Sequence, residues 1–246
     1  MNLCIISAWR NSAHNIPRYF QQVAALRKHG GSKLAVRVVA VEGDSTDSTR
    51  DLLLHYRHTL GKGMELDSLD DAVQIVTHNH GGRVFHSTED PDRLAALTGV
   101  MRAGMGAVCP NYGDDEMVLY VESDLIWDAH QVGSVIDLAA RREHGMDVIA
   151  PLVFAGPHFY DVLCYRGMDG QRFSPSPPYH RSLRWPMMLS SVCQVSSVGS
   201  CLAFRAELAR NVVPLGEQGL LSWCAGAQAQ GYKIGVAPMW RVEHPV

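Results

Sequence analysis

The stretch Val118-Leu-Tyr-Val-Glu-Ser-Asp-Leu-Ile-Trp127 decides the fold of this chain. Its first four residues form an uninterrupted apolar run, which is typical of a parallel strand buried on both faces. Two acids, Glu122 and Asp124, follow that run with one residue between them. In open α/β sheets ligands bind at the edge where such residues emerge, and oxygen ligands there suit Mg²⁺ or Mn²⁺ carrying a diphosphate. An isolated Glu-x-Asp is more often a helix cap, so its role depends on the rest of the chain.

The segments on both sides of this stretch alternate between strand and helix patterns. Apolar runs predict strands at 3–7, 34–41, 73–76 and 147–151, and helical spacing predicts helices at 15–28, from 50 onward, at 92–107 and at 128–142. Asn15 is expected to cap the first of these helices, with Pro17 in its first turn. The alternation predicts an α/β protein with a mostly parallel central sheet and helices on both faces.

The sequence changes character after Phe154. Residues 157–178 are rich in proline, glycine and aromatic residues, and such a loop either holds a ligand or packs on its own aromatic side chains. The sequence leaves both interpretations open. Beyond this loop, 199–205 is predicted as a strand entering a short helix, 216–230 as a helix and 232–242 as a closing strand.

Composition limits the classes of protein that fit. With 246 residues and a formal charge of −3, from 22 basic and 25 acidic residues, the chain has room for one sizeable domain and lacks a polybasic nucleic-acid footprint. No run approaches about 18 uninterrupted apolar residues, and the first residues resemble a strand more than a signal peptide, so we expect a cytoplasmic protein without a membrane span. The six cysteines are scattered without a C-x-x-C pair, which predicts free thiols.

Polar residues also follow the predicted strand at 34–41. The run Val39-Ala-Val-Glu-Gly-Asp-Ser-Thr-Asp-Ser-Thr49 resembles the end of the second strand in nucleotide-sugar-dependent glycosyltransferases of the GT-A fold. The resemblance implies that Glu42 reads the nucleoside, since a carboxylate accepts hydrogen bonds from a base or a ribose diol, and that Asp44 lies in the donor-binding turn. The other donor contacts assigned with this resemblance are Ser7, Ala8, Arg10, Arg93 and Ser123.

Two further elements resemble the metal site of the same fold. Glu122-Ser-Asp124 resembles its Asp-x-Asp motif with Glu in the first place. This implies Asp124 as a metal ligand and Glu122 as either a second ligand or a contact to the ribose or sugar of the donor. Trp240-Arg-Val-Glu-His244 resembles the C-terminal strand that supplies a histidine to the metal, which implies His244, with Glu243 as a neighbouring alternative.

Three blocks narrow the resemblance to the capsule-associated α-mannosyltransferase-like proteins first known in fungi. The blocks are Asp92–Arg102, Val118–Asp124 and Phe159–Gly170, and the last has a Phe-Tyr-Asp…Arg-x-x-Asp-Gly pattern. The chain departs from that family at Ala103, where Asn is usual, and at Glu122. The resemblance implies one GT-A domain over 1–246, with a nucleotide-sugar-binding half at 1–125 and a loop-rich acceptor-binding half at 126–246.

The activity that this resemblance implies is metal-dependent transfer of a sugar from a nucleoside diphosphate to an acceptor hydroxyl. A carboxylate close to the sugar can stabilise an oxocarbenium-like transition state or deprotonate the acceptor. Asp161, a lone acid between aromatic residues, is the first candidate for this role. Glu217, at the start of the helix predicted from 216, is the second. Arg93 and Arg166 are candidates for binding phosphate or sugar hydroxyls.

Two other classes of function stay open. A nucleotidyltransferase acting on sugar phosphates would share the sheet and the acids, but Ser7-Ala-Trp-Arg-Asn-Ser12 lacks the glycines that its phosphate loop would need. A non-catalytic nucleotide-sugar-binding module would not need the acids and the histidine together. The sequence does not identify the acceptor, which is a glycan, a lipid-linked sugar, a protein or a hydroxylated DNA base. The last choice is favoured only by a small basic group, His180, Arg181 and Arg184. The sequence does not indicate an oligomeric state.

Overall fold

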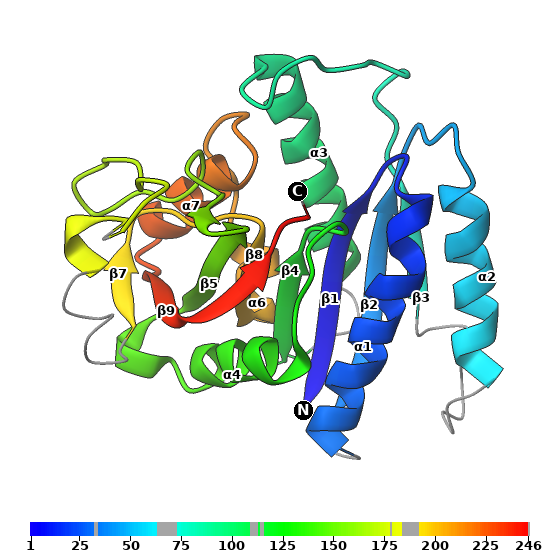
Figure 1. Cartoon of the computed structure of the whole chain (residues 1–246), viewed down its shortest axis with the longest axis horizontal. Coiled ribbons are helices and arrows are strands. Elements are labelled where there is room, and N and C mark those ends of the chain that lie inside the picture. The colour runs from blue at the N-terminus through cyan, green and yellow to red at the C-terminus, as the bar shows by residue number, and fades with distance from the viewer. Residues whose placement is uncertain are drawn as a thin grey trace.

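A central sheet organises the protein, and the elements follow the predicted alternation along the chain (Figure 1). The computed structural model describes residues 1–31, 34–62, 73–108, 113, 116–177, 179–183 and 192–245. The strands are β1 (Asn2–Trp9), β2 (Ala35–Glu42), β3 (Val73–Thr77), β4 (Met117–Val121), β5 (Val148–Ala155), β6 (His158–Phe159), β7 (Cys193–Val195), β8 (Cys201–Arg205) and β9 (Ile234–Glu243). The helices are α1 (Ile16–Gly30), α2 (Thr49–Lys62), α3 (Pro91–Val108), α4 (Ala129–Ala140), α6 (Ala206–Asn211) and α7 (Leu220–Ala229), and short 3-10 turns lie at Ala13–Asn15, Glu143–Gly145 and Arg181–Leu183.

The strands are ordered β3-β2-β1-β4-β8-β5-β9-β7 across the sheet, and β6 pairs with β5. The strands β1 to β4, β5 and β9 run in one direction, whereas β6, β7 and β8 run against them. The prediction of a mostly parallel α/β sheet is therefore confirmed. The antiparallel strands all come from the second half of the chain, where the sequence patterns gave no strand direction.

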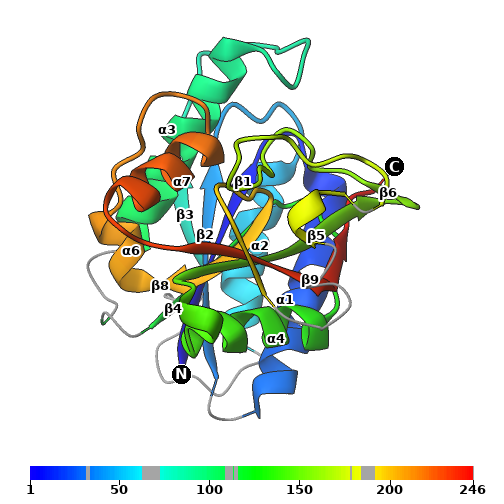
Figure 2. The same ribbon diagram turned by 90° about the vertical axis from the view of Figure 1, so that its left-hand side faces the viewer.

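Helices cover both faces of the sheet, as predicted. The apolar side chains of α1, α2 and α4 pack on one face, and those of α3, α6 and α7 pack on the other (Figure 2). Successive residues of β4 alternate between the two layers, so that Leu119 faces the first and Val118 and Tyr120 face the second. Because each such side chain contributes about 1.5–3 kcal/mol when it is buried, β4 is held firmly from both sides. Its end, where Glu122 and Asp124 follow, is fixed in position as a result.

Two helix starts differ from those expected from the sequence. The Asn15 side chain does not cap α1, because its Oδ1 accepts a hydrogen bond from Nη2 of Arg18 at 2.8 Å instead. The helix predicted from 216 begins at Leu220, since Gly216 and Gly219 adopt positive φ angles of 100° and 59° and keep this turn out of the helix. By contrast, Asp128 caps α4 by accepting from the backbone N–H groups of two residues in its first turn.

The loop after β5 packs largely on its own aromatic side chains. Phe159 lies 5.1 Å from Tyr165 and 5.7 Å from Phe173 between ring centroids, and Phe154 lies 5.6 Å from Tyr179. Of the two alternatives left open by the sequence, packing of the loop on its own aromatic side chains is therefore the one that these rings show. Tyr160 is not part of that cluster and is 39% exposed, so the loop also leaves an aromatic side chain at the surface.

The cysteines and the apolar character of the helices were both predicted from composition. The five cysteines among the described residues are free thiols, as predicted, and Cys109 lies outside the described part of the chain. Within the same residues, no helix has the length and apolar character needed to cross a bilayer.

Gly43, directly after β2, allows a close backbone approach that a larger residue would prevent. A Cβ atom at this position would lie 1.7 Å from the backbone oxygen of His78. We expect Gly43→Ala to lower the free energy of unfolding by about 2 kcal/mol or more, since the clash is with backbone that cannot rotate away. Urea unfolding of Gly106→Ala is the matched control, because a Cβ there meets nothing within 4 Å and the helix gains about 0.5–1 kcal/mol. Equal stabilities of the two variants would contradict the expectation.

Candidate active site

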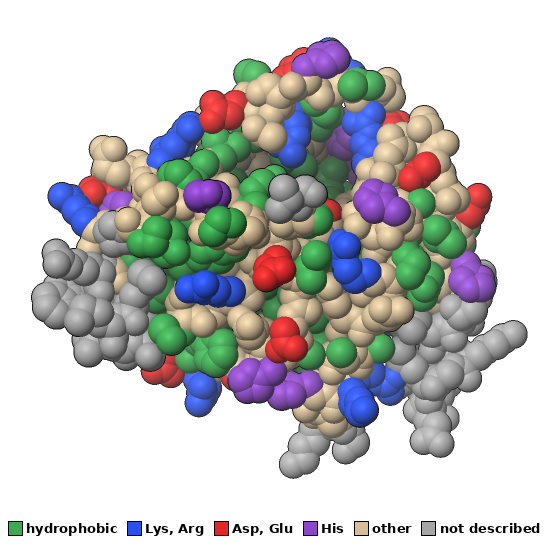
Figure 3. Space-filling view, in the orientation of Figure 1, with side chains coloured by type: hydrophobic (Ala, Val, Ile, Leu, Met, Phe, Trp, Pro, Cys, Tyr) green, Lys and Arg blue, Asp and Glu red, His purple; other side chains and the backbone are tan. Residues whose placement is uncertain are grey.

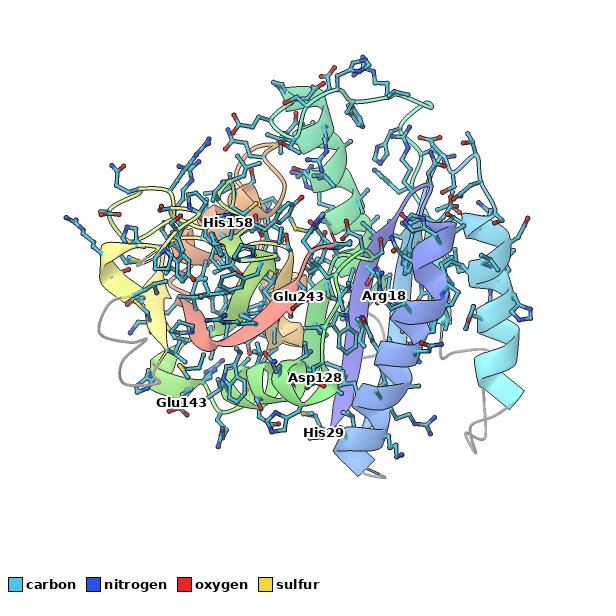
Figure 4. All side chains as sticks on the ribbon, viewed as in Figure 1. Arg18, His29, Asp128, Glu143, His158 and Glu243 are labelled. Atoms are coloured by element: carbon cyan, nitrogen blue, oxygen red, sulfur yellow. The ribbon has the colours of Figure 1, made fainter. Side chains whose placement is uncertain are left out.

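The loop after β4 and the end of β9 are joined by a pair of backbone hydrogen bonds. The amide of Ile126 donates to the carbonyl of Glu243 at 2.7 Å, and the amide of Glu243 donates back to Ile126 at 2.8 Å. This bridge places the loop that carries Asp124 beside the end of β9. In Figure 4, Glu243 marks the end of β9 and Arg18 lies on α1, the helix next to that loop.

The bridge brings Asp124 and His244 into direct contact. Nε2 of His244 lies 3.2 Å from Oδ2 of Asp124, although 120 residues separate them in the chain. The His244 ring stacks on Tyr160 at 3.8 Å between centroids, and its backbone amide donates to the carbonyl of Phe154 at 2.6 Å. The loop is held from the other side by Arg18, whose Nη2 donates to the backbone carbonyl of Asp124 at 2.7 Å. The end of the chain at His244 is thus tied into the site.

Asp124 and His244 could supply two of the ligands of a divalent metal ion. Oδ1 of Asp124 is buried and has no hydrogen-bond partner, so it is free to coordinate. A carboxylate with an imidazole suits Mn²⁺, and Mg²⁺ and Mn²⁺ sites commonly take their other ligands from phosphates and water. Among the described residues, however, no group of three or more His, Cys, Asp and Glu side chains converges for a metal. Glu122 therefore does not complete a three-ligand set with Asp124 and His244.

Two cavities meet at the end of β4, and the surface is hollowed on this side of the molecule (Figure 3). The β1-side cavity has a volume of about 330 Å³ and lies against the ends of β1, β2 and β4. The α7-side cavity has a volume of about 200 Å³ and lies between α3, the start of α7 and the loop after β6. Both cavities are lined by Arg93, Leu97, Tyr120 and Glu122. A ligand that fills both would therefore pass over Glu122.

Glu122 and Asp161 are acids with abnormal proton affinities. Burial, with the charges of Asp124 and Asp161 adding to it, raises the pKa of Glu122 to about 8. Burial also raises the pKa of Asp161, and hydrogen bonds from Ser200 and Cys164 limit that rise. Asp161 is 6% exposed, and its Oδ2 has no hydrogen-bond partner. The site therefore holds one glutamic acid that is mostly protonated at neutral pH and one buried carboxyl with an unpaired oxygen in the α7-side cavity.

The segment Gly199-Ser200 in front of β8 positions both acids. Ser200 adopts a left-handed conformation with φ 53°, its backbone carbonyl accepts from the amide of Glu122 at 2.9 Å, and its side chain bonds to both Glu122 and Asp161. A Cβ atom on Gly199 would lie 2.6 Å from Oδ2 of Asp161. Strained backbone of this kind is frequent at functional sites, where the surrounding structure holds it in place.

The β1-side cavity contains several of the residues that the sequence assigned to donor binding. Ala8, Arg10, Arg93, Ser123, Glu122 and Asp124 line it. Arg10 lies over the ring of Phe85 at 5.8 Å and donates to the backbone carbonyl of Arg83. Arg93 donates to the carbonyl of Thr88 at 3.0 Å. These arginines place positive charge beside the acids.

Three other donor candidates do not line either cavity. Ser7 is fully buried and shares a hydrogen bond with the hydroxyl of Tyr19, so it belongs to the core. Glu42 is 2% exposed, and its carboxylate already binds Nη1 of Arg50 at 3.3 Å and the amide of Ser45 at 3.3 Å. Asp44 accepts from the backbone amide of His80, which lowers its pKa. These three side chains have partners within the protein, and their contacts to a nucleotide stay a prediction.

Several other candidate residues also line neither cavity. Glu217 is exposed in the turn before α7 and does not open that helix, and Glu243 is exposed beside His244. The Arg166 side chain donates to the carbonyl of Gly170 at 3.5 Å and lines neither cavity. The prediction of a basic surface group is wrong for His180, which is 8% exposed and stacks on Phe173. Arg181 is paired with Asp169 at 2.8 Å, and Arg184 lies outside the described residues.

Three residues that build the site were not among those predicted from the sequence. Arg18 holds the Asp124 loop, Tyr160 stacks on His244, and Ser200 bonds to both acids. Each acts through a contact between segments that are far apart in the chain. Only the position of Tyr160 next to Asp161 could have indicated one of them.

The raised pKa of Glu122 predicts a specific dependence of stability on pH. Between its ordinary value of 4.5 and about 8, the folded protein binds a proton that the unfolded chain releases, so the free energy of unfolding falls as pH rises through this range. The glutamine in Glu122→Gln cannot ionise. We therefore expect the melting temperature of this variant, relative to that of the wild type, to increase as pH rises from 5 to 8. Thermal melts of both proteins in EDTA measure this, and a pH-independent difference would contradict it.

The mostly parallel central sheet with helices on both faces matches the GT-A glycosyltransferase fold. S. aureus TarS 1–349 matches 100% of this chain and 60% of its own length, with a TM-score of 0.57 and 14% identity. The complex of TarS 1–349 with UDP matches with a TM-score of 0.56 and 13% identity. GalNAc-T7 with UDP, GalNAc and Mn²⁺ matches 100% of this chain and 43% of its own length, with a TM-score of 0.60 and 13% identity.

At these identities the similarity shows the fold alone. The chain also spans only 60% of the TarS 1–349 structure and 43% of the GalNAc-T7 structure. By sequence, the chain matches no protein-family profile and no curated protein. The narrower resemblance to the capsule-associated α-mannosyltransferase-like proteins is therefore not confirmed and stays a prediction.

Proposed function

We propose that this protein is a glycosyltransferase that transfers a sugar from a nucleoside-diphosphate donor to an acceptor hydroxyl with the help of Mn²⁺ or Mg²⁺. The observation that carries the proposal is the contact at 3.2 Å between Asp124 and His244 beside the two joined cavities. The GT-A fold supports the same reaction class, since similar structures contain UDP, UDP-GlcNAc, or UDP with Mn²⁺.

In this proposal the β1-side cavity binds the donor. Arg10 and Arg93 line it and supply positive charge near the diphosphate, and Asp124 with His244 holds the metal. A bound divalent metal would neutralise the charge that develops on the departing diphosphate. Glu122, protonated at neutral pH because of its pKa of about 8, donates a hydrogen bond to the ribose or sugar above it. The residues of this cavity all come from positions up to 124, in agreement with a donor-binding first half.

The α7-side cavity supplies the acceptor face of the reaction. The bond between the sugar's anomeric carbon and the diphosphate oxygen breaks, and a bond from that carbon to the acceptor oxygen forms. The acceptor proton passes to the unpaired Oδ2 of Asp161, whose raised pKa makes it a better base than an ordinary aspartate. The low exposure of Asp161, 6%, limits the access of water to this transfer.

A thermal-shift panel of nucleotides and nucleotide sugars, each with and without Mn²⁺, tests the function. We expect one nucleoside diphosphate and its sugar conjugates to stabilise the protein only when Mn²⁺ is present, by about 2.7 kcal/mol at 100 times the dissociation constant. Turnover with that conjugate should release the nucleoside diphosphate. Release of pyrophosphate from a nucleoside triphosphate would instead show a nucleotidyltransferase, and binding without turnover would show a binding module.

A further inference from the structure

We infer that the α7-side cavity selects an uncharged glycoside as acceptor, a single hydroxylated ring with an apolar face, over the same ring carrying a phosphate. This inference rests on the proposed function, because it names the acceptor class of that reaction. It depends on the lining of the cavity and not on the identity of the donor.

The cavity presents a hydrogen-bond acceptor that needs a partner. Oδ2 of Asp161 is buried without one, and leaving such an atom unpaired is unfavourable. A hydroxyl group that enters the cavity donates to this oxygen, whereas a phosphate dianion at the same position of the ring has no proton to donate. Gln218 and Ser200, also in the lining, supply further polar contacts for the other hydroxyls of one ring.

The walls of the cavity are mostly apolar. The aliphatic and thioether side chains in its lining are Leu94, Leu97, Met101, Val162, Leu163 and Leu220. Such walls match the apolar C–H face of a sugar ring, and contact with them removes that face from water. The volume of about 200 Å³ is below the range of about 300–1,000 Å³ for sites of drug-sized ligands, so it has room for one ring.

The charges around the cavity disfavour an anion. Its described lining contains the carboxyl groups of Glu89 and Asp161 against one arginine, Arg93, whose Nη1 already donates to the carbonyl of Thr88. Glu122, also in the lining, is mostly protonated at neutral pH and adds no positive charge. Arg172, near the rim, is paired with Glu89 at 2.9 Å. A phosphate here would lie beside Glu89 and Asp161 without a guanidinium of its own, and contact between like charges is unfavourable.

The test uses matched pairs of acceptors with the full chain. The probes are the p-nitrophenyl glycosides of glucose, galactose and mannose and the 6-phosphates of the same glycosides, with UDP and Mn²⁺ present. Their affinities are measured by saturation-transfer NMR, which does not require turnover. We expect the neutral member of a pair to bind at least about tenfold more tightly. Leu163→Arg, which adds a cation to the wall, should shift that ratio toward the phosphate by about tenfold or more.

The control adds the same charge elsewhere. Met239→Arg changes an exposed side chain of β9 that lines neither cavity, and it should leave the ratio unchanged. Equal or better binding of the phosphates, no binding of any neutral member, or an unchanged ratio in Leu163→Arg would overturn the inference. Stabilisation of the protein by UDP with Mn²⁺ is measured in the same samples. If UDP, or another nucleoside diphosphate of the thermal-shift panel, stabilises the protein in the presence of Mn²⁺, such results overturn the acceptor class alone. If none of them does, the proposed function fails as well.

Discussion

Asp161→Asn is expected to lower turnover by about 10²- to 10⁴-fold while the affinity for the donor stays near that of the wild type. Asparagine has nearly the same shape but cannot take the acceptor proton, and the residue lies in the α7-side cavity, outside the lining of the donor cavity. The measurements are single-turnover transfer and donor binding by titration calorimetry. A donor affinity that falls in parallel with turnover would assign Asp161 to donor binding instead.

Glu217→Gln provides the control for that experiment. Both substitutions replace an acid by its amide in the second half of the chain, but Glu217 is exposed in the turn before α7 and lines neither cavity. We expect its turnover to stay within about twofold of the wild type. Loss of turnover in Glu217→Gln with full activity in Asp161→Asn would reverse the two roles.

Asp124→Asn is expected to remove metal-dependent donor binding and to lower turnover at least about 100-fold. The carboxylate that faces His244 is lost, but the loop keeps its hydrogen bond from Arg18 because that bond goes to the backbone carbonyl. The fold should therefore be retained. Mn²⁺ affinity, donor affinity and melting temperature are measured together, with Asp137→Asn on the exposed side of α4 as a control for the change in charge.

His244→Phe separates the ligand role of the imidazole from its packing. Phenylalanine can keep the stack on Tyr160 but has no ring nitrogen to offer a metal. If His244 binds the metal, this variant should lose Mn²⁺ affinity as Asp124→Asn does, with little change in melting temperature. Mn²⁺ affinity equal to that of the wild type would leave His244 with a packing role alone.

The sequence predicted those parts of the fold that depend on local pattern. The apolar runs of β1, β2, β4 and β5 identify buried strands because a strand covered on both faces needs apolar residues at every position. The position of Asp124 at the end of β4 followed from the same pattern. The antiparallel insertion of β8 between β4 and β5 has no such local signal, since strand direction is decided by pairing partners distant in sequence.

The side-chain contacts that the sequence did not predict have a common physical origin. Asn15 is a good capping residue, but Arg18 one turn later competes for its oxygen. Ser7 and Glu42 lie at the ends of the expected strands, yet their side chains are taken up by Tyr19 and by Arg50. A strand end predicts which residues approach the edge of the sheet. It does not predict which polar side chains are already bonded to a neighbour, because that depends on the tertiary structure.

The reciprocal hydrogen bonds between Ile126 and Glu243 make the state of the site observable in two amide protons. Both amides exchange with solvent only when the loop after β4 separates from the end of β9, and the same separation parts Asp124 from His244. A ligand that binds both side chains must therefore slow exchange at both amides, by a factor set by its concentration relative to its dissociation constant. Occupancy of the site can then be followed by hydrogen exchange without any assay of turnover.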